Sequence, residues 1–524
     1  MAEPWVRFED EHLLVATKPA GVNTHRPDTH AQDGLYEWVQ RQRPNDSLST
    51  LHRLDKATSG LLVFGKSTLA NQSLARQFET RTVAKHYELL VERDARRPDS
   101  LHCDRPVRSS DRGGGREALT DFRRRAAGTS FERYEAQPHT GRTHQVRVHA
   151  EELGMPIVGD EEHGGVDAAR LFLHAARLEI DHPIDGPIDL QADRPSSFDL
   201  VLHGTDPNTA TVAALAAHES RAVLFDPTDT DAYLWIDRHH DGFGSLRLER
   251  LGDVALALNY DDTSTPLASK WIAAWNDTLP LRAIYEQRRP RGGGGGSARL
   301  VSGTAHPRFE VTELGCRYLV DLEASSTSSG LFLDQRETRR RLVAADRAGT
   351  TVLNAFAHTG SLSVAAARAG AETLTLDLSK RYLDWARDNL RANDIDPGDH
   401  DFIYGDALEW MDRLARAGRT FDVVLVDPPS SSTSGKRSRT RWLVDRDLHA
   451  LVEKAARLGA PGGTVFVSTN LRRMRWPRFL EHLDEGLAAA GRSGTIETQT
   501  LPLDHRSGPG DLPYLKAAWI ELDG

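Results

Sequence analysis

Residues 52–60 read HRLDKATSG and place one acidic residue, Asp55, just before a Thr-Ser-Gly turn. Two further stretches lie in the last third of the chain, VLNAFAHTG at 352–360 and VLVDPP at 424–429. Short apolar strands and turns surround the first stretch, whereas strands alternate with helical segments around the other two. The sequence therefore predicts two unrelated domains, each with its own functional motif.

Composition indicates a multidomain globular protein. The chain has 524 residues, too many for a single core, with 39% hydrophobic and 27% charged residues. No apolar run reaches the length of about 18 residues that suggests a membrane span, and the first residues do not form a signal peptide. Only Cys103 and Cys316 occur, which excludes a disulfide framework and a Cys-only zinc site. We expect a cytoplasmic protein that does not associate with membranes.

Charge is distributed unevenly along the chain. The net charge of −10 is unfavourable for a phosphate-binding protein. Residues 51–150, however, contain 19 Lys and Arg against 12 Asp and Glu, and residues 151–200 contain 3 against 12. The basic part surrounds the first motif and is suited to an RNA partner.

The secondary-structure pattern divides the chain into three parts. We expect a mixed α+β, β-rich domain over residues 1–204, a small α+β module over 205–310 and an α/β doubly wound domain over 311–524. The predicted strands and helices are strands at 13–16, 60–64, 87–91, 222–225, 233–236, 351–353, 373–376, 421–426 and 464–468, and helices at 267–275 and 382–393.

Asp55 by itself could simply cap a turn. Its companions in sequence point to chemistry: KHY at 85–87, GRTHQVRVH at 141–149, GMPIVGD at 154–160 and LFLHA at 171–175. With these motifs in this order, the N-terminal part of the chain resembles the RluA-type pseudouridine synthases.

This resemblance implies that Asp55 is the catalytic aspartate, that Tyr87 stacks on the target base and that Arg147 pairs with Asp55. Moving a base from its glycosidic nitrogen to carbon requires an ionised carboxylate, and an adjacent guanidinium lowers the pKa of such a group. The target uridine must be flipped out of any duplex. We expect Arg53 and Arg142 to contact RNA, and we expect neither a cofactor nor a metal.

Histidines within these motifs invite a metal interpretation. His52, His144 and His149 are close enough in sequence to be considered together. We expect them to act as hydrogen-bonding scaffold residues instead.

The second site follows the pattern of a nucleotide-type pocket at the carboxyl ends of parallel strands. A strand ends at Asn354, and a turn containing Phe356, Thr359 and Gly360 leads into a helix. Asp377 ends the next strand and could bind two ribose hydroxyls. We expect Asp406 to contact an adenine and Asp427-Pro428 to close the pocket after the fourth strand.

These motifs together resemble the class I S-adenosylmethionine (SAM) methyltransferases that act on RNA, and are similar to the guanine-N7 large-subunit rRNA methyltransferase family. GLFLDQR at 330–336 and WARDN at 385–389 support this resemblance, although Asn354 stands where many methyltransferases have an acid. The resemblance implies SAM as cofactor and RNA as partner, either 23S rRNA, a pre-ribosomal particle or tRNA. It also implies that the middle module grips RNA.

The residues around the fourth and fifth strands indicate which atom is methylated. Methylation of cytosine C5 needs a cysteine nucleophile, but Ser468-Thr469-Asn470 stands where that cysteine is expected. Guanine N7 has a free lone pair and needs only alignment with the methyl group. The stretches 427–437 and 468–473 resemble the guanine-N7 half of the bacterial bifunctional rRNA methyltransferases, and this resemblance implies guanine N7 as the target. The predicted substrate-binding residues of this half are Gln335, Arg336, Lys436, Arg437 and Asn470.

The predicted function is a bifunctional RNA-modifying enzyme. Two alternatives stay open. One is a single-activity pseudouridine synthase with a passive methyltransferase-like RNA clamp, and the other is a non-catalytic ribosome-assembly factor. The sequence leaves the modified positions, the order of the reactions and the oligomeric state undetermined.

Overall fold

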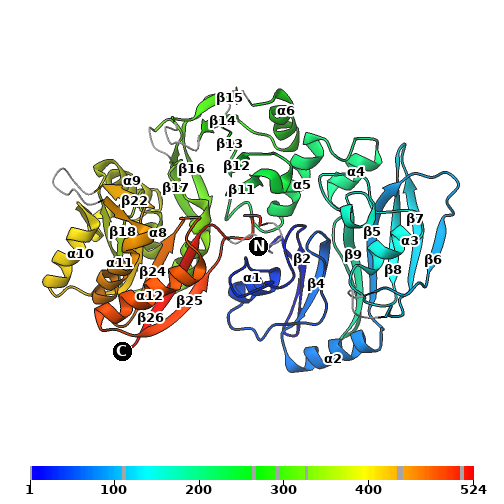
Figure 1. Cartoon of the computed structure of the whole chain (residues 1–524), viewed down its shortest axis with the longest axis horizontal. Coiled ribbons are helices and arrows are strands. Elements are labelled where there is room, and N and C mark those ends of the chain that lie inside the picture. Colours follow the sequence, from blue (N-terminus) through cyan, green and yellow to red (C-terminus); the bar gives the residue numbers. More distant parts are fainter. Residues whose placement is uncertain are drawn as a thin grey trace.

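The computed structural model consists of three parts, arranged around one central segment (Figure 1). It describes residues 3–108, 114–261, 267–289, 296–324, 328–433, 441–507 and 513–524. Among these residues, no helix has the length and apolar character needed to span a bilayer.

The N-terminal domain is built on a ten-stranded sheet in the order β1-β2-β4-β9-β5-β8-β7-β6, with β3 beside β4 and β10 beside β9. Its strands are β1 (Val6–Glu9), β2 (Leu13–Lys18), β3 (Ser49–Thr50), β4 (Ser59–Gly65), β5 (Ala84–Glu92), β6 (Ser100–Cys103), β7 (Thr120–Ala127), β8 (Phe131–Pro138), β9 (Leu173–His182) and β10 (Gly186–Gln191). Its helices are α1 (Leu35–Gln42), α2 (Thr68–Glu79), α3 (Gln145–Glu152) and α4 (Ser196–Leu202).

Strand β9 joins the two halves of this sheet and thereby sets the position of the first motif. Ala175 on β9 pairs with Gly60 on one side and with Tyr87 on the other. Gly60 has φ +120, and a Cβ there would lie 2.2 Å from the Ala175 carbonyl oxygen, so only glycine fits this close approach. The Asp55 loop, directly before β4, is therefore held next to the start of β5.

The middle module is a five-stranded sheet in the order β11-β12-β13-β14-β15. Its elements are α5 (Ala210–Ala222), β11 (Ala232–Asp237), β12 (Leu246–Leu251), β13 (Val254–Asn259), α6 (Ser269–Thr278), β14 (Ala283–Arg288) and β15 (Arg299–Gly303). This confirms an α+β module. The predicted strand at 222–225 is wrong, because helix α5 ends there and a turn follows.

The C-terminal domain has the predicted doubly wound architecture. Its sheet runs β20-β19-β18-β21-β24-β26-β25, with β18 to β21 and β24 parallel and β26 antiparallel to both neighbours. Its strands are β16 (Arg308–Glu313), β17 (Cys316–Asp321), β18 (Thr351–Ala355), β19 (Glu372–Asp377), β20 (Asp401–Tyr404), β21 (Phe421–Val426), β22 (Ser431–Thr433), β23 (Arg441–Leu443), β24 (Gly459–Thr469), β25 (Gly494–Gln499) and β26 (Lys516–Leu522). Its helices are α7 (Arg336–Ala344), α8 (Ser361–Arg368), α9 (Lys380–Ala392), α10 (Ala407–Arg416), α11 (Val444–Leu458) and α12 (Trp476–Ala490).

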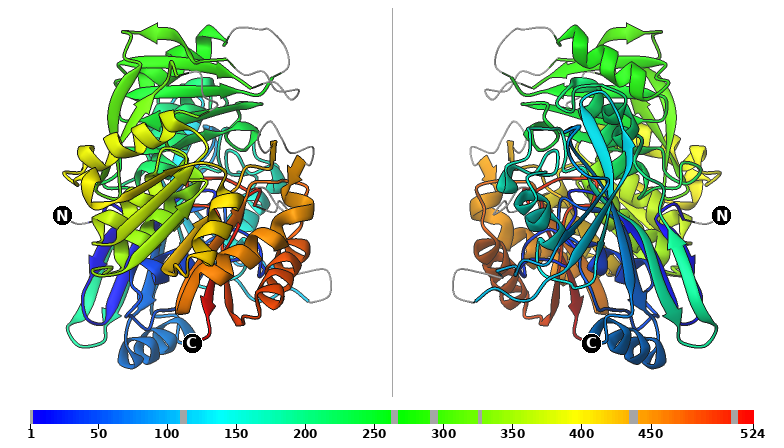
Figure 2. Two further views of the ribbon diagram at one scale, coloured as in Figure 1. Left: turned by 90° about the vertical axis from the view of Figure 1, so that its left-hand side faces the viewer. Right: turned by 90° about the vertical axis from the view of Figure 1, so that its right-hand side faces the viewer.

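Residues 500–507, which follow β25, leave the C-terminal domain and reach the centre of the molecule (Figures 1 and 2). We call them the central segment. Gln32 Nε2 donates hydrogen bonds to the carbonyl oxygens of Pro502 (2.8 Å) and His505 (2.6 Å). Leu503 belongs to a core shared with Trp38 of the N-terminal domain and Trp235 of the middle module. The central segment thus contacts all three parts. The domain boundaries at residues 204 and 310 stay a prediction.

A buried network of ions lies at this junction. Arg336 donates from Nη1 to Asp504 Oδ1 (2.6 Å) and from Nε to Glu313 Oε1 (2.9 Å). Arg339 Nε donates to Glu313 Oε2 (2.5 Å), and the Leu234 amide donates to Asp504 Oδ2 (2.8 Å). All four charged side chains are fully buried. Arg336 was predicted to contact RNA. In the structure its guanidinium is buried and bonds to Glu313, Asp504 and the Ala232 carbonyl.

We expect Asp504→Asn to lower the free energy of unfolding by about 3–5 kcal/mol, because Glu313 alone then faces the two buried charges of Arg336 and Arg339. Urea unfolding monitored by tryptophan fluorescence measures the change. The control is Asp394→Asn, whose carboxylate pairs with Arg317 at the surface and should leave the transition unchanged. Equal transitions for the two variants would contradict the assigned role of the network.

Candidate active sites

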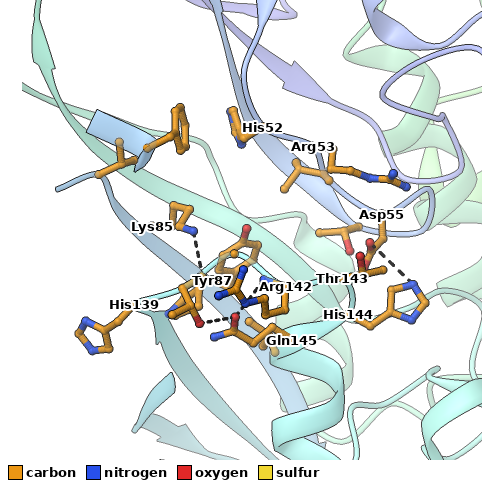
Figure 3. Close-up of a pocket in the computed structure, with 18 of the residues that line it drawn as sticks. His52, Arg53, Asp55, Lys85, Tyr87, His139, Arg142, Thr143, His144 and Gln145 are labelled. Atoms are coloured by element: carbon orange, nitrogen blue, oxygen red, sulfur yellow. Dashed lines mark hydrogen bonds and ion pairs between the residues drawn. The ribbon is translucent and has the colours of Figure 1, made fainter. Parts of the chain in front are cut away.

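A cavity of 490 Å³ opens in the N-terminal domain around Asp55. Three stretches line most of it: 51–58 before β4, 78–87 around the start of β5, and 138–147 leading into α3 (Figure 3). The predicted residues Arg53, Asp55, Tyr87, Arg142 and Arg147 all line this one cavity. These residues are far apart in the sequence, and the pairing of β9 with both β4 and β5 brings their segments together.

The Asp55 carboxylate faces a guanidinium and an imidazole, each at a distance longer than a hydrogen bond. Arg147 Nη1 lies 3.7 Å from Oδ2, and His144 Nε2 lies 3.8 Å from Oδ1. The Asp55 side chain is 21% exposed, so it is open to the cavity. This arrangement places the Asp55 carboxylate on the wall of the cavity, with the positive charge of Arg147 beside it.

Arg147 is held in place by other acids. Its Nε and Nη2 donate to the two oxygens of Asp160 (2.7 and 2.6 Å), and Nη2 also donates to Glu162 (2.8 Å). Only Nη1 is left to face Asp55. Arg147 lies in the first turn of helix α3. His144, the residue that precedes this helix, takes the left-handed conformation with φ 54. The bidentate pair with Asp160 makes Arg147 a fixed charge beside Asp55.

Tyr87 and Lys85 project from β5 toward the same cavity, since residues two apart on a strand share a face (Figure 3). Burial, together with the charge of Asp55, raises the pKa of Tyr87, so its phenol stays neutral. Burial lowers the pKa of Lys85 to about 8, and its Nζ donates to the Thr140 carbonyl (3.2 Å). Sequence reasoning gave Lys85 no role, although its spacing from Tyr87 could have indicated one.

The two arginines predicted to contact RNA are arranged differently. Arg53 is exposed at the cavity rim. Arg142 is partly buried and donates from Nε to the Glu117 carbonyl (3.1 Å). Arg53 is therefore the freer of the two to meet a phosphate.

The histidines of these motifs mostly hold the scaffold. His52 Nε2 accepts the Val63 amide (3.0 Å) and its ring stacks on Phe78, and burial lowers its pKa to about 3. His149 bonds to Thr120 and to the Arg105 carbonyl. His144 differs, because it faces Asp55 across the cavity.

The turn after β18 has the tight geometry of a cofactor loop. Phe356 and His358 take positive φ (60 and 51), and Gly360, with φ +74, precedes α8. A Cβ at Gly360 would lie 2.6 Å from Ala386 Cβ, so the turn packs directly on α9. The side chains of Asn354 and Thr359 are turned inward: Asn354 donates to Ser363 Oγ (2.9 Å) and Thr359 to the Gly330 carbonyl (2.5 Å). These two shape the turn.

Asp377 lies at the end of β19, next to the turn. Its carboxylate accepts the amides of His358 and Ser379 (both 2.8 Å), and burial raises its pKa. Beside it, the apolar side chain of Leu378 is 56% exposed, and Tyr404 at the end of β20 is 53% exposed. A carboxylate next to an exposed apolar side chain fits the ribose and the base of a nucleoside. Leu378 carried no sequence signal beyond its adjacency to Asp377.

Asp406 begins α10, where its Oδ1 accepts the Glu409 amide (3.1 Å) as a helix cap. The cap uses one carboxylate oxygen. The other oxygen stays available for the predicted contact with adenine.

Asp427 follows β21 and is bound by neighbours on two other elements. Ser468 Oγ, near the end of β24, donates to Asp427 Oδ1 (2.5 Å), and Gln335 Nε2 donates to Ser468 Oγ (3.2 Å). Burial raises the pKa of Asp427 to about 6. Pro428 is buried behind it. Gln335, Asp427 and Ser468 thus form one chain of hydrogen bonds at the carboxyl edge of the sheet.

Asn470 is exposed just beyond this chain, and its Oδ1 accepts Ser430 Oγ (2.9 Å). Lys436 and Arg437 lie outside the described residues. Both cysteines are buried, and Cys316 is on β17, away from this edge of the sheet.

Comparisons with known proteins match both halves of the chain. The family model for RNA pseudouridylate synthases matches residues 12–152, and the model for S-adenosylmethionine-dependent methyltransferases matches residues 262–490. The two matches, which end at residues 152 and 490, together cover both candidate sites.

Curated relatives include two proteins named ribosomal RNA large subunit methyltransferase K/L. The one from Allochromatium vinosum is 43% identical over 202 residues, which is 38% of this chain and 26% of that protein. The one from Shewanella loihica is 39% identical over 212 residues, 40% of this chain and 28% of that protein. The chain thus spans about a quarter of the length of these relatives.

Solved structures share the fold of the methyltransferase half. A methyltransferase named SMU.776, solved with SAH, is 24% identical with a TM-score of 0.55, covering 67% of this chain and 89% of that one. A SAM-dependent methyltransferase from Streptococcus mutans gives 24% identity, a TM-score of 0.53 and coverage of 66% and 87%. With the family matches and the two sites described above, the chain is a fusion of an RluA-type pseudouridine synthase domain and a SAM-dependent methyltransferase domain.

Proposed function

We propose that this chain modifies one class of RNA twice, isomerising uridine to pseudouridine in the N-terminal cavity and methylating a base at the C-terminal site. The observation that carries the first activity is the convergence of Asp55, Arg147 and Tyr87 on one cavity. The observation that carries the second is the Asp377 carboxylate beside the exposed Leu378, with Asp427 after β21, on the other side of β18 in the same sheet.

The isomerisation breaks the C1′–N1 bond of uridine and forms a C1′–C5 bond; C5 loses its hydrogen as a proton and N1 takes up a proton, so the product is an isomer. We assign Asp55 as the carboxylate that acts on the nucleotide, since it lines the cavity and the Arg147 guanidinium lies 3.7 Å from its Oδ2. Tyr87, neutral and at the cavity wall, offers a flat face for the flipped base. Lys85 lies on the same strand face and is suited to the substrate's phosphate or carbonyl oxygen.

At the second site, the side chains fit SAM. We assign Asp377 to the ribose hydroxyls, Leu378 to a face of the adenine and Asp406 to its edge. Phe356, Gly360 and the buried Pro428 form the walls, with Asn354 and Thr359 supporting the turn from within. When bound, the cofactor supplies an electrophilic methyl group. Asp427 and Asn470 are then placed to orient the target base.

We infer that the methylated atom is a nitrogen, guanine N7 being the candidate. Cytosine C5 methylation needs a thiolate, and both cysteines are buried away from the Asp427 edge. The relatives named ribosomal RNA large subunit methyltransferase K/L support 23S rRNA, free or in a pre-ribosomal particle, as substrate, which would place the protein in the cytoplasm. Transfer RNA is the competing substrate to test.

We expect Asp55→Asn to slow pseudouridine formation by about 1,000-fold or more, because the amide cannot act as an anionic carboxylate. Tritium release from RNA labelled at uridine C5 measures the reaction on 23S rRNA and tRNA transcripts. Asp181→Asn, an exposed aspartate on β9, is the control.

Methylation by Asp55→Asn, measured by nucleoside mass spectrometry, should stay unchanged, since the two sites are separate. Formation of pseudouridine alone by the parent chain would favour the passive-clamp alternative. Formation of neither nucleoside would favour the assembly-factor alternative.

We expect Asp377→Ala to weaken binding of S-adenosylhomocysteine by about 10-fold or more, because a hydrogen bond to a charged group contributes at least about 1.4 kcal/mol. Isothermal titration calorimetry of the full chain measures it. Asp384→Ala, an exposed acid on the adjacent helix α9, is the control and should bind normally. Equal affinities of the two variants would contradict the assigned ribose contact.

We expect the methylation rate to rise about tenfold from pH 5 to pH 7. With a pKa of about 6, Asp427 is mostly protonated at pH 5 and mostly ionised at pH 7, and the ionised carboxylate accepts much more strongly from a donor on the base than the protonated form does. Single-turnover rates across this range test it. Asp427→Asn should be slower and should lack this rise. The same rise in Asp427→Asn would assign the titration to another group.

A further inference from the structure

Two histidines and a glutamate meet where α11 packs against α12. His449 comes from α11, and His482 and Glu485 lie one turn apart on α12. Glu485 Oε2 is 3.7 Å from His482 Nδ1 and 4.0 Å from His449 Nδ1. The two imidazole rings are parallel, with an interplanar angle of 3° and centroids 5.7 Å apart.

Both Nδ1 atoms are buried and have no hydrogen-bond partner. The His482 side chain is 0% exposed, and its Nε2 donates to the Asp445 carbonyl (3.2 Å). Because a neutral imidazole has one N–H, this bond leaves a lone pair on Nδ1, directed toward His449 and Glu485. A buried polar atom left unpaired costs stability, so its retention requires an explanation.

Glu485 completes the group with one carboxylate oxygen. Its Oε1 faces Arg478 Nη1 at 3.6 Å, and its Oε2 faces the two histidines. Glu485 and His449 are each about two-fifths exposed, so the group can be reached from solvent although His482 is sealed. The three ligand atoms lie within 4.8 Å of one another.

We propose that His449, His482 and Glu485 bind one divalent transition-metal ion, with zinc as the cation that this donor set suits best. Two imidazole nitrogens and one carboxylate oxygen match its preferences, and water would fill a fourth position. The His482 bond to a backbone carbonyl is the outer contact that fixes a metal-binding imidazole in the right tautomer. With metal–ligand bonds of about 2.0–2.2 Å, tetrahedral ligand atoms lie about 3.4 Å apart, so Glu485 Oε2 needs to approach each of the two Nδ1 atoms by only a few tenths of an ångström.

The ion would act as a structural tie behind the methyltransferase site. Asp445, whose carbonyl holds His482, begins α11 right after β23 and pairs through Oδ2 with Arg473 Nη2 (3.2 Å). Arg473 follows the Ser468–Asn470 stretch. The ion would therefore fix the two segments that leave β23 and β24 relative to each other. The inference does not depend on the proposed catalytic activities.

A second group, His144, Glu162 and His163, has similar spacing but lies in the N-terminal cavity. There Arg147 Nη2 donates at 2.8 Å to Glu162 Oε2, the same oxygen that faces His144, so a guanidinium already occupies the ligand oxygen and would repel a cation. In the proposed site Arg478 faces the other oxygen of Glu485. It provides a control for the proposed site.

The test is a metal titration of the full chain after removal of bound ions with a chelator. We expect one equivalent of Zn²⁺ to bind and to raise Tm, and one equivalent of Co²⁺ to give visible absorption bands. His449→Gln and Glu485→Gln should each weaken binding by about 100-fold or more, since even loss of an outer-shell contact costs 10- to 100-fold. His449 is partly exposed, so its substitution should leave the helix packing intact.

Two matched controls accompany these variants. Glu481→Gln changes an exposed glutamate one turn earlier on α12, and His163→Gln removes the second group. Both should bind Zn²⁺ as the parent chain does. Absence of binding in the parent chain, unchanged binding in His449→Gln, or loss of binding in His163→Gln would each overturn the proposal.

Discussion

The buried pairing of Arg336 with Asp504 and Glu313 holds the middle module against the C-terminal domain, and it anchors the central segment that also contacts the N-terminal domain. Charges removed from water are tolerated only when their partners are in place, so this network allows one relative position of the parts that supply it. Asp504 comes from the central segment, Glu313 from β16 and Leu234, which donates to Asp504, from the middle module. The surrounding apolar core stabilises the junction, and the ions specify its geometry.

The central segment also links the surroundings of the two candidate sites. Lys56, the neighbour of Asp55, donates to the Ser507 carbonyl. Beyond the segment, Tyr514 donates to Asp334 Oδ2 (2.9 Å), next to Gln335 and the Asp427 chain of hydrogen bonds. One loop of the methyltransferase fold therefore contacts the Asp55 loop at one end and the Asp427 edge at the other. Such a loop explains physically why the two domains form one body although each site is assembled within its own domain.

Much of the fold and the membership of the two sites could be predicted from local patterns. Strands β4, β5, β18 and β21 and the parallel sheet follow from apolar runs that alternate with turns or helices. The short apolar run at 222–225 was ambiguous because periodicity alone does not separate a brief strand from a helix end. Side-chain direction was equally inaccessible. Asn354 and Thr359 turn inward, and Arg336 pairs with acids distant in sequence, which no local pattern specifies.

By itself, the sequence determined the chemical groups available: one motif carboxylate with its arginine and tyrosine, a second set of acids at strand ends, and no cysteine where a C5 methyltransferase needs one. These follow from residue type and spacing, which are local properties. Only the tertiary structure decided which groups face each other. The pairing of β9 between β4 and β5 brings Asp55 to Tyr87, burial raises the pKa of Asp427, and helix packing brings His449 to His482. Distance, burial and charge compensation arise only when distant segments pack together.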